Sequence, residues 1–138
     1  MPAFEIIDHT ADIGIRAFGR DEKTAFENAA AGMFSLITDL EDVEELNEYP
    51  IEVESEDRET LLVEWLNELL YVYESSEVLL RSFRITDMEE TRLRGIALGE
   101  PVDRSRHRLK TDIKAATYYM LRVQQTQEDW QAEVIFDV

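Results

Sequence analysis

The sequence predicts an α+β protein in which two helices pack on a mixed or antiparallel β-sheet, as a single two-layer domain over residues 1–138. Two segments carry apolar residues at helical spacing, whereas alternating apolar and polar residues mark the strands. The second half of the chain is rich in Thr, Tyr, Val and Ile, which favours a sheet. A chain of this length can bury one ordinary core.

The N-terminal part predicts two strands and a helix. Residues 4–7 and 13–18 are apolar enough for short strands, with a turn from Asp8 to Asp12 between them. Asp21 is a suitable helix N-cap. Apolar residues then recur at helical spacing and predict an amphipathic helix over residues 22–38.

A second strand and helix follow an acidic connection. Residues 50–55 alternate between apolar and charged side chains, as in a strand buried on one face. Asp57 is expected to cap a helix with a wide apolar stripe from Leu61 to Tyr73. Trp65 lies on this stripe, so we expect it in the core.

The C-terminal half predicts two hairpins. The pattern changes to a period of two residues after the second helix, which indicates strands. We expect residues 82–88 to pair with 92–98, and residues 113–125 to pair with 131–137. Short polar turns join the members of each pair.

Composition limits the classes of function. The chain has no Cys, which excludes disulfides, thiolate metal sites and Cys nucleophiles. It contains neither a signal-peptide pattern nor a run of about 20 apolar residues, so a cytoplasmic protein is expected. The formal net charge of −17 repels phosphate and argues against tight direct binding of nucleic acid. Basic partners or cations are favoured instead.

The charge is unevenly distributed. Residues 39–59 contain eleven Asp or Glu and a single basic residue, Arg58. Residues 103–114 show the opposite bias, with five basic residues and two acidic ones. Each stretch is either a solvated loop or charged edge strand, or a contact surface for a partner.

Known catalytic motifs are missing from the sequence. There is no Gly-rich phosphate loop and no Gly-x-Ser-x-Gly elbow. His9 and His107 are the only histidines, too few for a histidine-rich transition-metal site within one chain.

Acidic groups at both ends of the chain are the best candidates for a site. Asp12 precedes a strand-like run, and Asp137 follows another, so that the Val138 α-carboxylate would lie beside it. Oxygen donors of this kind suit Ca²⁺ or Mg²⁺. Asp8, His9 and His107 are candidates for supporting roles. The alternative is that the Asp residues serve turns and the chain end is frayed.

Several motifs resemble those of the archease family. Asp8-His9-Thr10-Ala11-Asp12-Ile13-Gly14 precedes a Phe-x-x-Ala-Ala-x-x-Met helix, and the chain closes on Val134-Ile135-Phe136-Asp137-Val138. The resemblance covers nearly the whole chain in order. The matching segments are residues 8–14, 26–33, 65–70, 103–107, 113–118 and 134–138.

This resemblance implies a function. Archeases are small α+β proteins, not enzymes themselves, that assist the tRNA-splicing RNA ligase. That ligase joins 2′,3′-cyclic-phosphate or 3′-phosphate ends to 5′-hydroxyl ends with GTP and Mn²⁺. Archeases promote guanylylation of its histidine and multiple turnover. The family's metal ligands correspond to Asp12, Asp137 and Val138, with Ca²⁺ the usual assignment and Mg²⁺ or Mn²⁺ as alternatives.

One position departs from the family. Archeases commonly have Thr-Tyr-His where this chain has Thr117-Tyr118-Tyr119, so a step that needs an imidazole there is in doubt.

Two other functions stay open: a stand-alone metal-dependent hydrolase that uses Asp12 and Asp137, and a general acidic chaperone. The sequence also leaves open whether an archease-like protein would deliver a metal to the ligase or remodel it.

Overall fold

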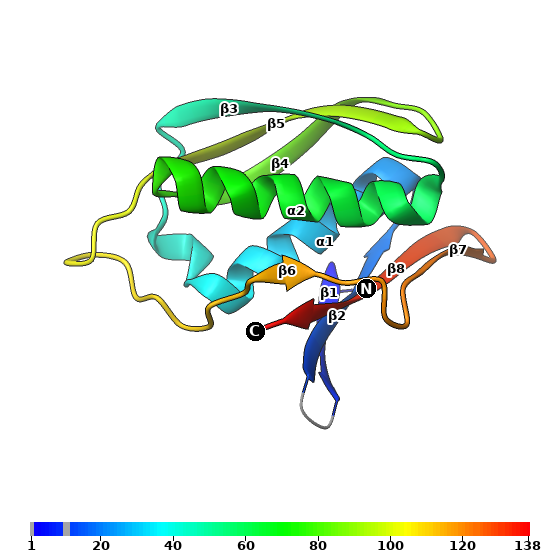
Figure 1. Ribbon diagram of the computed structural model, residues 1–138, viewed down its shortest axis with the longest axis horizontal. Helices are drawn as coiled ribbons and strands as arrows, with labels where there is room; N and C mark the ends of the chain where they lie inside the picture. Colours follow the sequence, from blue (N-terminus) through cyan, green and yellow to red (C-terminus); the bar gives the residue numbers. More distant parts are fainter. Residues whose placement is uncertain (1, 10–11) are drawn as a thin grey trace.

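A computed structural model describes residues 2–9 and 12–138, and Figure 1 shows its elements. Their bounds are β1 Phe4–His9, β2 Asp12–Gly19, α1 Glu22–Ile37, η1 Leu40–Asp42, β3 Asn47–Glu54, α2 Arg58–Ser76, β4 Val78–Met88, β5 Arg92–Pro101, β6 Ala115–Ala116, β7 Arg122–Thr126 and β8 Asp129–Asp137.

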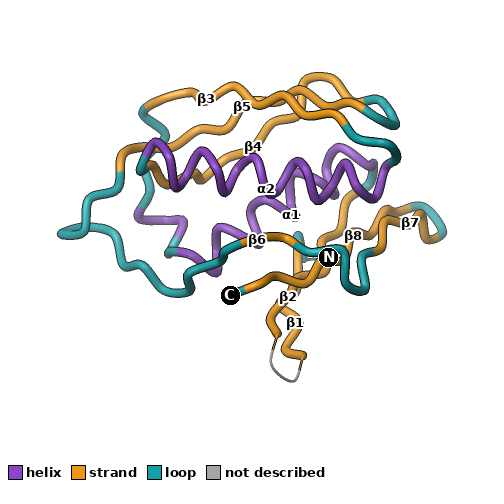
Figure 2. Tube along the Cα trace, in the orientation of Figure 1, coloured by secondary structure: helices purple, strands orange, loops and turns teal. Residues whose placement is uncertain are grey.

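The strands form two antiparallel sheets, with both helices between them (Figures 1 and 2). One sheet has the order β3-β5-β4, and the other has the order β1-β2-β8-β6, with β7 also paired to β8. The predicted α+β class, with two helices on antiparallel strands, is confirmed. The layering differs from the prediction, because the strands divide into two sheets that enclose the helices instead of forming one.

The apolar surface of α2 explains this additional layer. Leu61, Leu62 and Val63 are consecutive and all buried, although successive residues of a helix point about 100° apart. One sheet cannot cover so wide an apolar arc. The helix accordingly contacts β3 of one sheet and β6 of the other.

Both predicted helix caps are present. The Asp21 carboxylate accepts a hydrogen bond of 2.8 Å from the N–H of Thr24, and Asp57 forms a reciprocal capping box with Thr60. Trp65 is fully buried, as predicted. Its indole N–H donates to the carbonyl of Phe26 at 3.0 Å and so joins the two helices.

The hairpin of β4 and β5 and the early strands are also confirmed, but they are longer than predicted. The two strands extend into the expected turn, since β1 ends at His9 and β2 begins at Asp12. The remainder of that turn, residues 10 and 11, lies outside the described residues. β3 tolerates Pro50 because it is an edge strand, where a missing N–H breaks no ladder.

The last hairpin differs most from the sequence prediction. In place of one strand over residues 113–125, β6 and β7 pair with the same strand, β8, and a turn separates them. The Thr117 N–H and hydroxyl both donate to the carbonyl of Ile135, at 3.0 and 2.8 Å. Met120 then adopts a left-handed conformation, with φ of 54°. The chain therefore leaves the ladder between the two short strands.

Candidate functional site

Asp12 and Asp137 lie at the ends of neighbouring strands. β2 and β8 are antiparallel, and their register pairs Ile13 with Phe136. Asp12 directly precedes Ile13, and Asp137 directly follows Phe136, so the two carboxylates extend from the same end of the sheet. Because side chains alternate along a strand, both lie on the face opposite Ile15 and the core.

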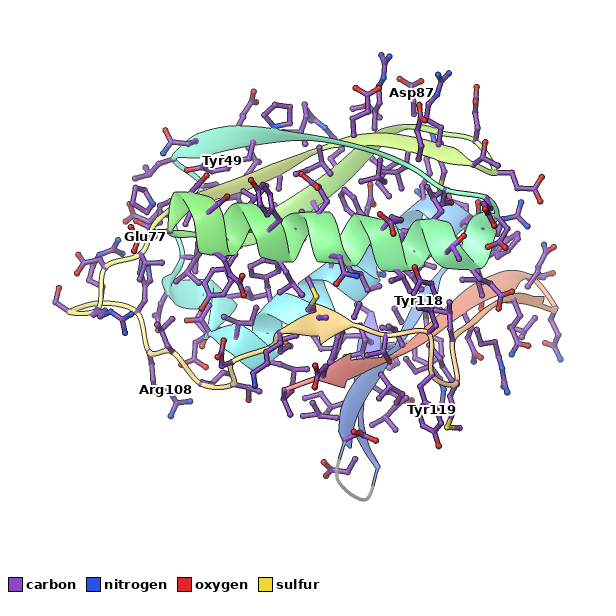
Figure 3. All side chains as sticks on the ribbon, in the orientation of Figure 1. Tyr49, Glu77, Asp87, Arg108, Tyr118 and Tyr119 are labelled. Carbon is purple, nitrogen blue, oxygen red and sulfur yellow. The ribbon has the colours of Figure 1, made fainter. Side chains whose placement is uncertain are left out.

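The two carboxylates share a pocket of about 350 Å³. Its floor is apolar and its rim carries oxygen atoms from β2, β8 and the β6–β7 connection. Figure 3 shows Tyr119 on the side of this sheet that faces away from the helices. The lining residues are Asp12, Ala115, Thr117, Tyr119, Ile135, Phe136 and Asp137.

Gly14 allows this floor to form. The Ile135 side chain crosses the face of β2 at Gly14, where a Cβ would lie only 2.6 Å from its Cδ1 and 2.5 Å from the carbonyl oxygen of Val134. Ile135 is consequently buried although it lies on the outer face of the sheet. The glycine of the Asp-Ile-Gly motif is therefore required by close packing beneath the pocket.

The donor atoms of the pocket suit a hard cation. They are the carboxylates of Asp12 and Asp137 and the hydroxyls of Thr117 and Tyr119, and oxygen ligands favour Ca²⁺ or Mg²⁺ over softer metals. Within residues 2–9 and 12–138, no three side chains of His, Cys, Asp or Glu gather as a metal site. The side chains thus fit a cation that keeps several waters, and not one enclosed by the protein.

The other predicted residues of the acidic end are placed differently. Val138 follows Asp137 and is 46% exposed. Asp8 is opposite Ile13 in the ladder, so its side chain lies on the other face from Asp12. The backbone of His9 pairs with Asp12, but the side chain of His9 lies outside what the structure describes.

His107 does not line this pocket. It is buried, its Nε2 lies 3.0 Å from the carboxylate of Glu100, and its Nδ1 accepts the N–H of Asp103 at 2.9 Å. Both ring nitrogens are therefore already used. His107 holds the connection after β5 against the end of that strand.

Glu100 is a buried carboxylate that the sequence analysis did not identify. It accepts hydrogen bonds from the N–H of Glu44 at 2.6 Å, from Arg106 and from His107. Burial raises the pKa of Glu100, but these donors outweigh it and hold the pKa below its usual value. The only signal in the sequence was an acidic residue that ends an alternating apolar strand, which is a common pattern at strand ends.

Much of the basic segment of residues 103–114 is paired within the protein. Arg106 contacts Glu100, whereas Arg108 and Lys110 lie 3.4 and 3.2 Å from the carboxylate of Asp39. Most of the segment is irregular, as expected for a loop, and its role as a contact surface for a partner stays a prediction. Arg104 makes no ion pair with any residue that the structure describes.

In the described part of the chain, neither helix combines the length and apolar character needed to cross a membrane.

The fold and the pocket define an acidic α+β protein with two carboxylates at one end of a sheet. Residues 4–138 match the model of the archease protein family (MTH1598/TM1083). The chain belongs to the archease family.

Individual relatives agree with this assignment. The chain is 39% identical to the archease of Methanosarcina barkeri over 98% of its own length and 95% of that protein. It is similar in structure to protein 1598 of Methanobacterium thermoautotrophicum, with a TM-score of 0.83, 36% identity and full coverage of both chains. A Thermotoga maritima protein described as an archease and possible chaperone shares the fold, with a TM-score of 0.59, 20% identity and coverage of 96% and 94%.

Proposed function

We propose that this protein is a non-catalytic, cytoplasmic cofactor protein that activates the tRNA-splicing RNA ligase. In this proposal it promotes guanylylation of the ligase and multiple turnover in tRNA splicing or RNA repair. The observation that carries the proposal is the convergence of Asp12 and Asp137 in one pocket, in a chain that belongs to the archease family.

The proposed cation ligands are the carboxylates of Asp12 and Asp137 and the Val138 α-carboxylate. Their oxygen chemistry favours Ca²⁺, with Mg²⁺ or Mn²⁺ as alternatives. A bound cation would neutralise two carboxylates that otherwise repel each other at the ends of adjacent strands. The chain's own part is to fix Asp12 on β2 and Asp137 on β8, above a floor that Gly14 and Ile135 keep closely packed.

The charge of the protein supports a protein partner and not direct RNA binding. A net charge of −17 repels the phosphate backbone but accelerates encounter with the basic surface expected of an RNA-binding enzyme. Activation would follow from delivery or repositioning of a metal, or from preferential binding of one ligase state.

Ligation by the cognate ligase tests this proposal. We expect substoichiometric protein to increase the number of turnovers per ligase, and Asp12→Asn to lose most of this stimulation. Asp87→Asn is the matched control, since Asp87 is an exposed acid on the other sheet (Figure 3). Stimulation by Asp12→Asn equal to that of Asp87→Asn would remove the pocket from the mechanism. Turnover of a phosphate ester by the protein alone would favour a hydrolase.

A general chaperone is the second candidate. Tyr118 and Met120 are 57% and 53% exposed on the turn between β6 and β7, and exposed apolar residues can hold unfolded clients. Suppressed aggregation of unrelated proteins, together with no effect on the ligase, would support this function over ligase activation.

A further inference from the structure

Asn67 of α2 pairs with the backbone of β6 as a neighbouring strand would. The Ala116 N–H donates to Asn67 Oδ1 at 2.8 Å, and Asn67 Nδ2 donates to the Ala116 carbonyl at 3.3 Å. The carboxamide thus satisfies both backbone groups of one residue. Asn67 is half-buried, so water competes only partly for these hydrogen bonds.

Among the described residues, the other hydrogen bonds that hold β6 are all made to β8, and they include those from the N–H and hydroxyl of Thr117 to the carbonyl of Ile135. β6 contains only Ala115 and Ala116, which pair on the other side with Asp137 and Phe136 of β8. The N–H of Lys114 also donates to the carbonyl of Asp137 at 2.8 Å. A two-residue strand has too few ladder bonds to hold its position alone. The side chain of Asn67 therefore supplies the second edge of this strand.

The restrained segment forms one wall of the acidic pocket. Ala115 and Thr117, on either side of Ala116, both line the cavity that Asp12 and Asp137 share. The contacts run without a break from α2 through Asn67 and Ala116 to the backbone of Asp137. A displacement of β6 would move the Thr117 wall and the strand end that carries the Asp137 carboxylate.

We propose that Asn67 is a positioning residue for the acidic pocket, which sets the geometry of Asp137 through β6. This inference rests on the proposed function for its consequence in cation binding. It makes the helix layer part of the site, although α2 contributes no residue to the lining of the pocket. Aspartate cannot replace Asn67, because it lacks the N–H₂ donor and turns an oxygen toward the Ala116 carbonyl.

Asn28 provides a matched control. Its Nδ2 donates to the carbonyl of Phe18 at 2.6 Å, which is also a bond from a helix amide to a strand backbone. Phe18 lies near the end of β2 that is remote from Asp12. Asn28→Asp therefore makes the same chemical change in the same fold, away from the pocket.

The experiment compares Asn67→Asp with Asn28→Asp by NMR and by Tb³⁺ titration of the full chain. In Asn67→Asp we expect amide exchange at Ala116 to become about tenfold faster and the amide resonances of Ala115 and Asp137 to shift. The affinity for Tb³⁺ should fall by about fivefold or more. Asn28→Asp should leave all three quantities near their parent values. Asn67→Ala and Asn28→Ala repeat the comparison without added charge if an aspartate variant fails to fold.

The exchange rate of Ala116, the resonances of Asp137 and the affinity for Tb³⁺ together test whether Asn67 positions the pocket. Unchanged exchange at Ala116 in a folded Asn67 variant overturns the inference. Faster exchange with unchanged Asp137 resonances and unchanged Tb³⁺ affinity also overturns it, because Asn67 would then only attach the helix to the sheet. If the parent binds no Tb³⁺, the proposed cation site fails, and the exchange and resonance data still decide whether Asn67 positions Asp137.

Discussion

The imidazole of His107 lies 3.0 Å from the buried carboxylate of Glu100. Since Nδ1 of the ring accepts the N–H of Asp103, the ring proton is on Nε2 and His107 donates it to Glu100. Arg106 contacts the same carboxylate. This cluster attaches the connection after β5 to the end of that strand, and the same connection leads on to β6 at the acidic pocket.

Acid should release this cluster. Burial raises the pKa of Glu100, but its hydrogen-bond donors lower the pKa by a larger amount. The pKa in the folded state is therefore below the usual value. Such a group stabilises the fold above the unfolded-state pKa of about 4.3 and loses that contribution as pH falls through the folded-state pKa. We expect Glu100→Gln to lower the free energy of unfolding by about 3 kcal/mol at pH 7, and by much less in acid. Urea unfolding at several pH values measures both.

Glu48→Gln is the control for the general effect of removing one negative charge, because Glu48 is exposed and makes no ion pair in the described residues. Its stability should follow the parent at every pH. If Glu100→Gln and Glu48→Gln show the same dependence on pH, the buried carboxylate does not account for the acid sensitivity.

Arg106 and Arg104 should respond very differently to charge reversal. Arg106→Glu places a second carboxylate against the buried Glu100 in place of the half-exposed guanidinium, so we expect the melting temperature to fall by about 10 °C. Arg104→Glu should change it by about 2 °C or less, since Arg104 has no ion pair in the described chain. Scanning calorimetry of both variants gives the comparison. Equal melting temperatures would show that the contact of Arg106 with Glu100 contributes no stability.

This contrast changes how the basic segment should be tested as a partner contact. In the proposed function, the basic stretch from Arg104 to Lys110 is a secondary contact with the ligase, and Arg106→Glu is the obvious substitution from sequence alone. In the structure that substitution would disturb the fold. Arg104→Glu is the clean probe, and we expect it to reduce stimulation less than Asp12→Asn does.

Calcium binding should depend on both strand ends. Asp12→Asn and Asp137→Asn each remove one charged oxygen ligand from the pocket, and we expect each to weaken Ca²⁺ binding by about tenfold or more, the scale on which ligand charge tunes such sites. Asp87→Asn should bind like the parent. Isothermal titration calorimetry with Ca²⁺ measures all four proteins. Parent affinity in either pocket variant would exclude that residue as a ligand.

The sequence predicted local structure better than it predicted assembly. Asp21 and Asp57 revealed both helix starts because a capping carboxylate acts within three residues of itself. The division into two sheets could not be read in this way, since it depends on which strands hydrogen-bond across long separations. The break in residues 113–125 had the same origin, because the last bonds before the chain leaves the ladder join Thr117 to the carbonyl of Ile135, which is 18 residues away.

The candidate site shows the same limit. Asp12 and Asp137 stand out because each is a charged residue beside an apolar run, and antiparallel pairing of β2 with β8 brings them together. Thr117 and Ala115 are not charged residues beside an apolar run, so the sequence does not single them out. They reach the pocket only because β6 pairs with β8. The role of Asn67 depends on which residues of α2 lie beside β6 when the helix packs on the sheet. A residue pattern within one helix does not contain that information.

Extension of the C-terminus should impair the pocket without unfolding the protein. A few residues added after Val138 would convert its α-carboxylate to a neutral amide and crowd Asp137. We expect weaker Ca²⁺ binding and weaker ligase stimulation, with a melting temperature close to the parent because Val138 is outside β8 and 46% exposed. The same residues added before Met1 are the control. Full activity in the C-terminally extended protein would exclude the α-carboxylate as a ligand.

Stimulation of the ligase should weaken as salt increases. With a net charge of −17, the protein is steered toward a basic surface by long-range attraction, which is screened over about 8 Å at physiological ionic strength. We therefore expect the rate of activation at limiting protein to fall between low and physiological salt, after correction for the salt response of the ligase alone. Asp12→Asn changes the total charge by only one unit, so its residual activity should show nearly the same salt dependence.

The isolated protein should not bind labelled tRNA halves, because the electrostatic field of its net negative charge repels phosphate. Tight, salt-sensitive binding of those RNAs without the ligase would instead show an RNA-binding protein.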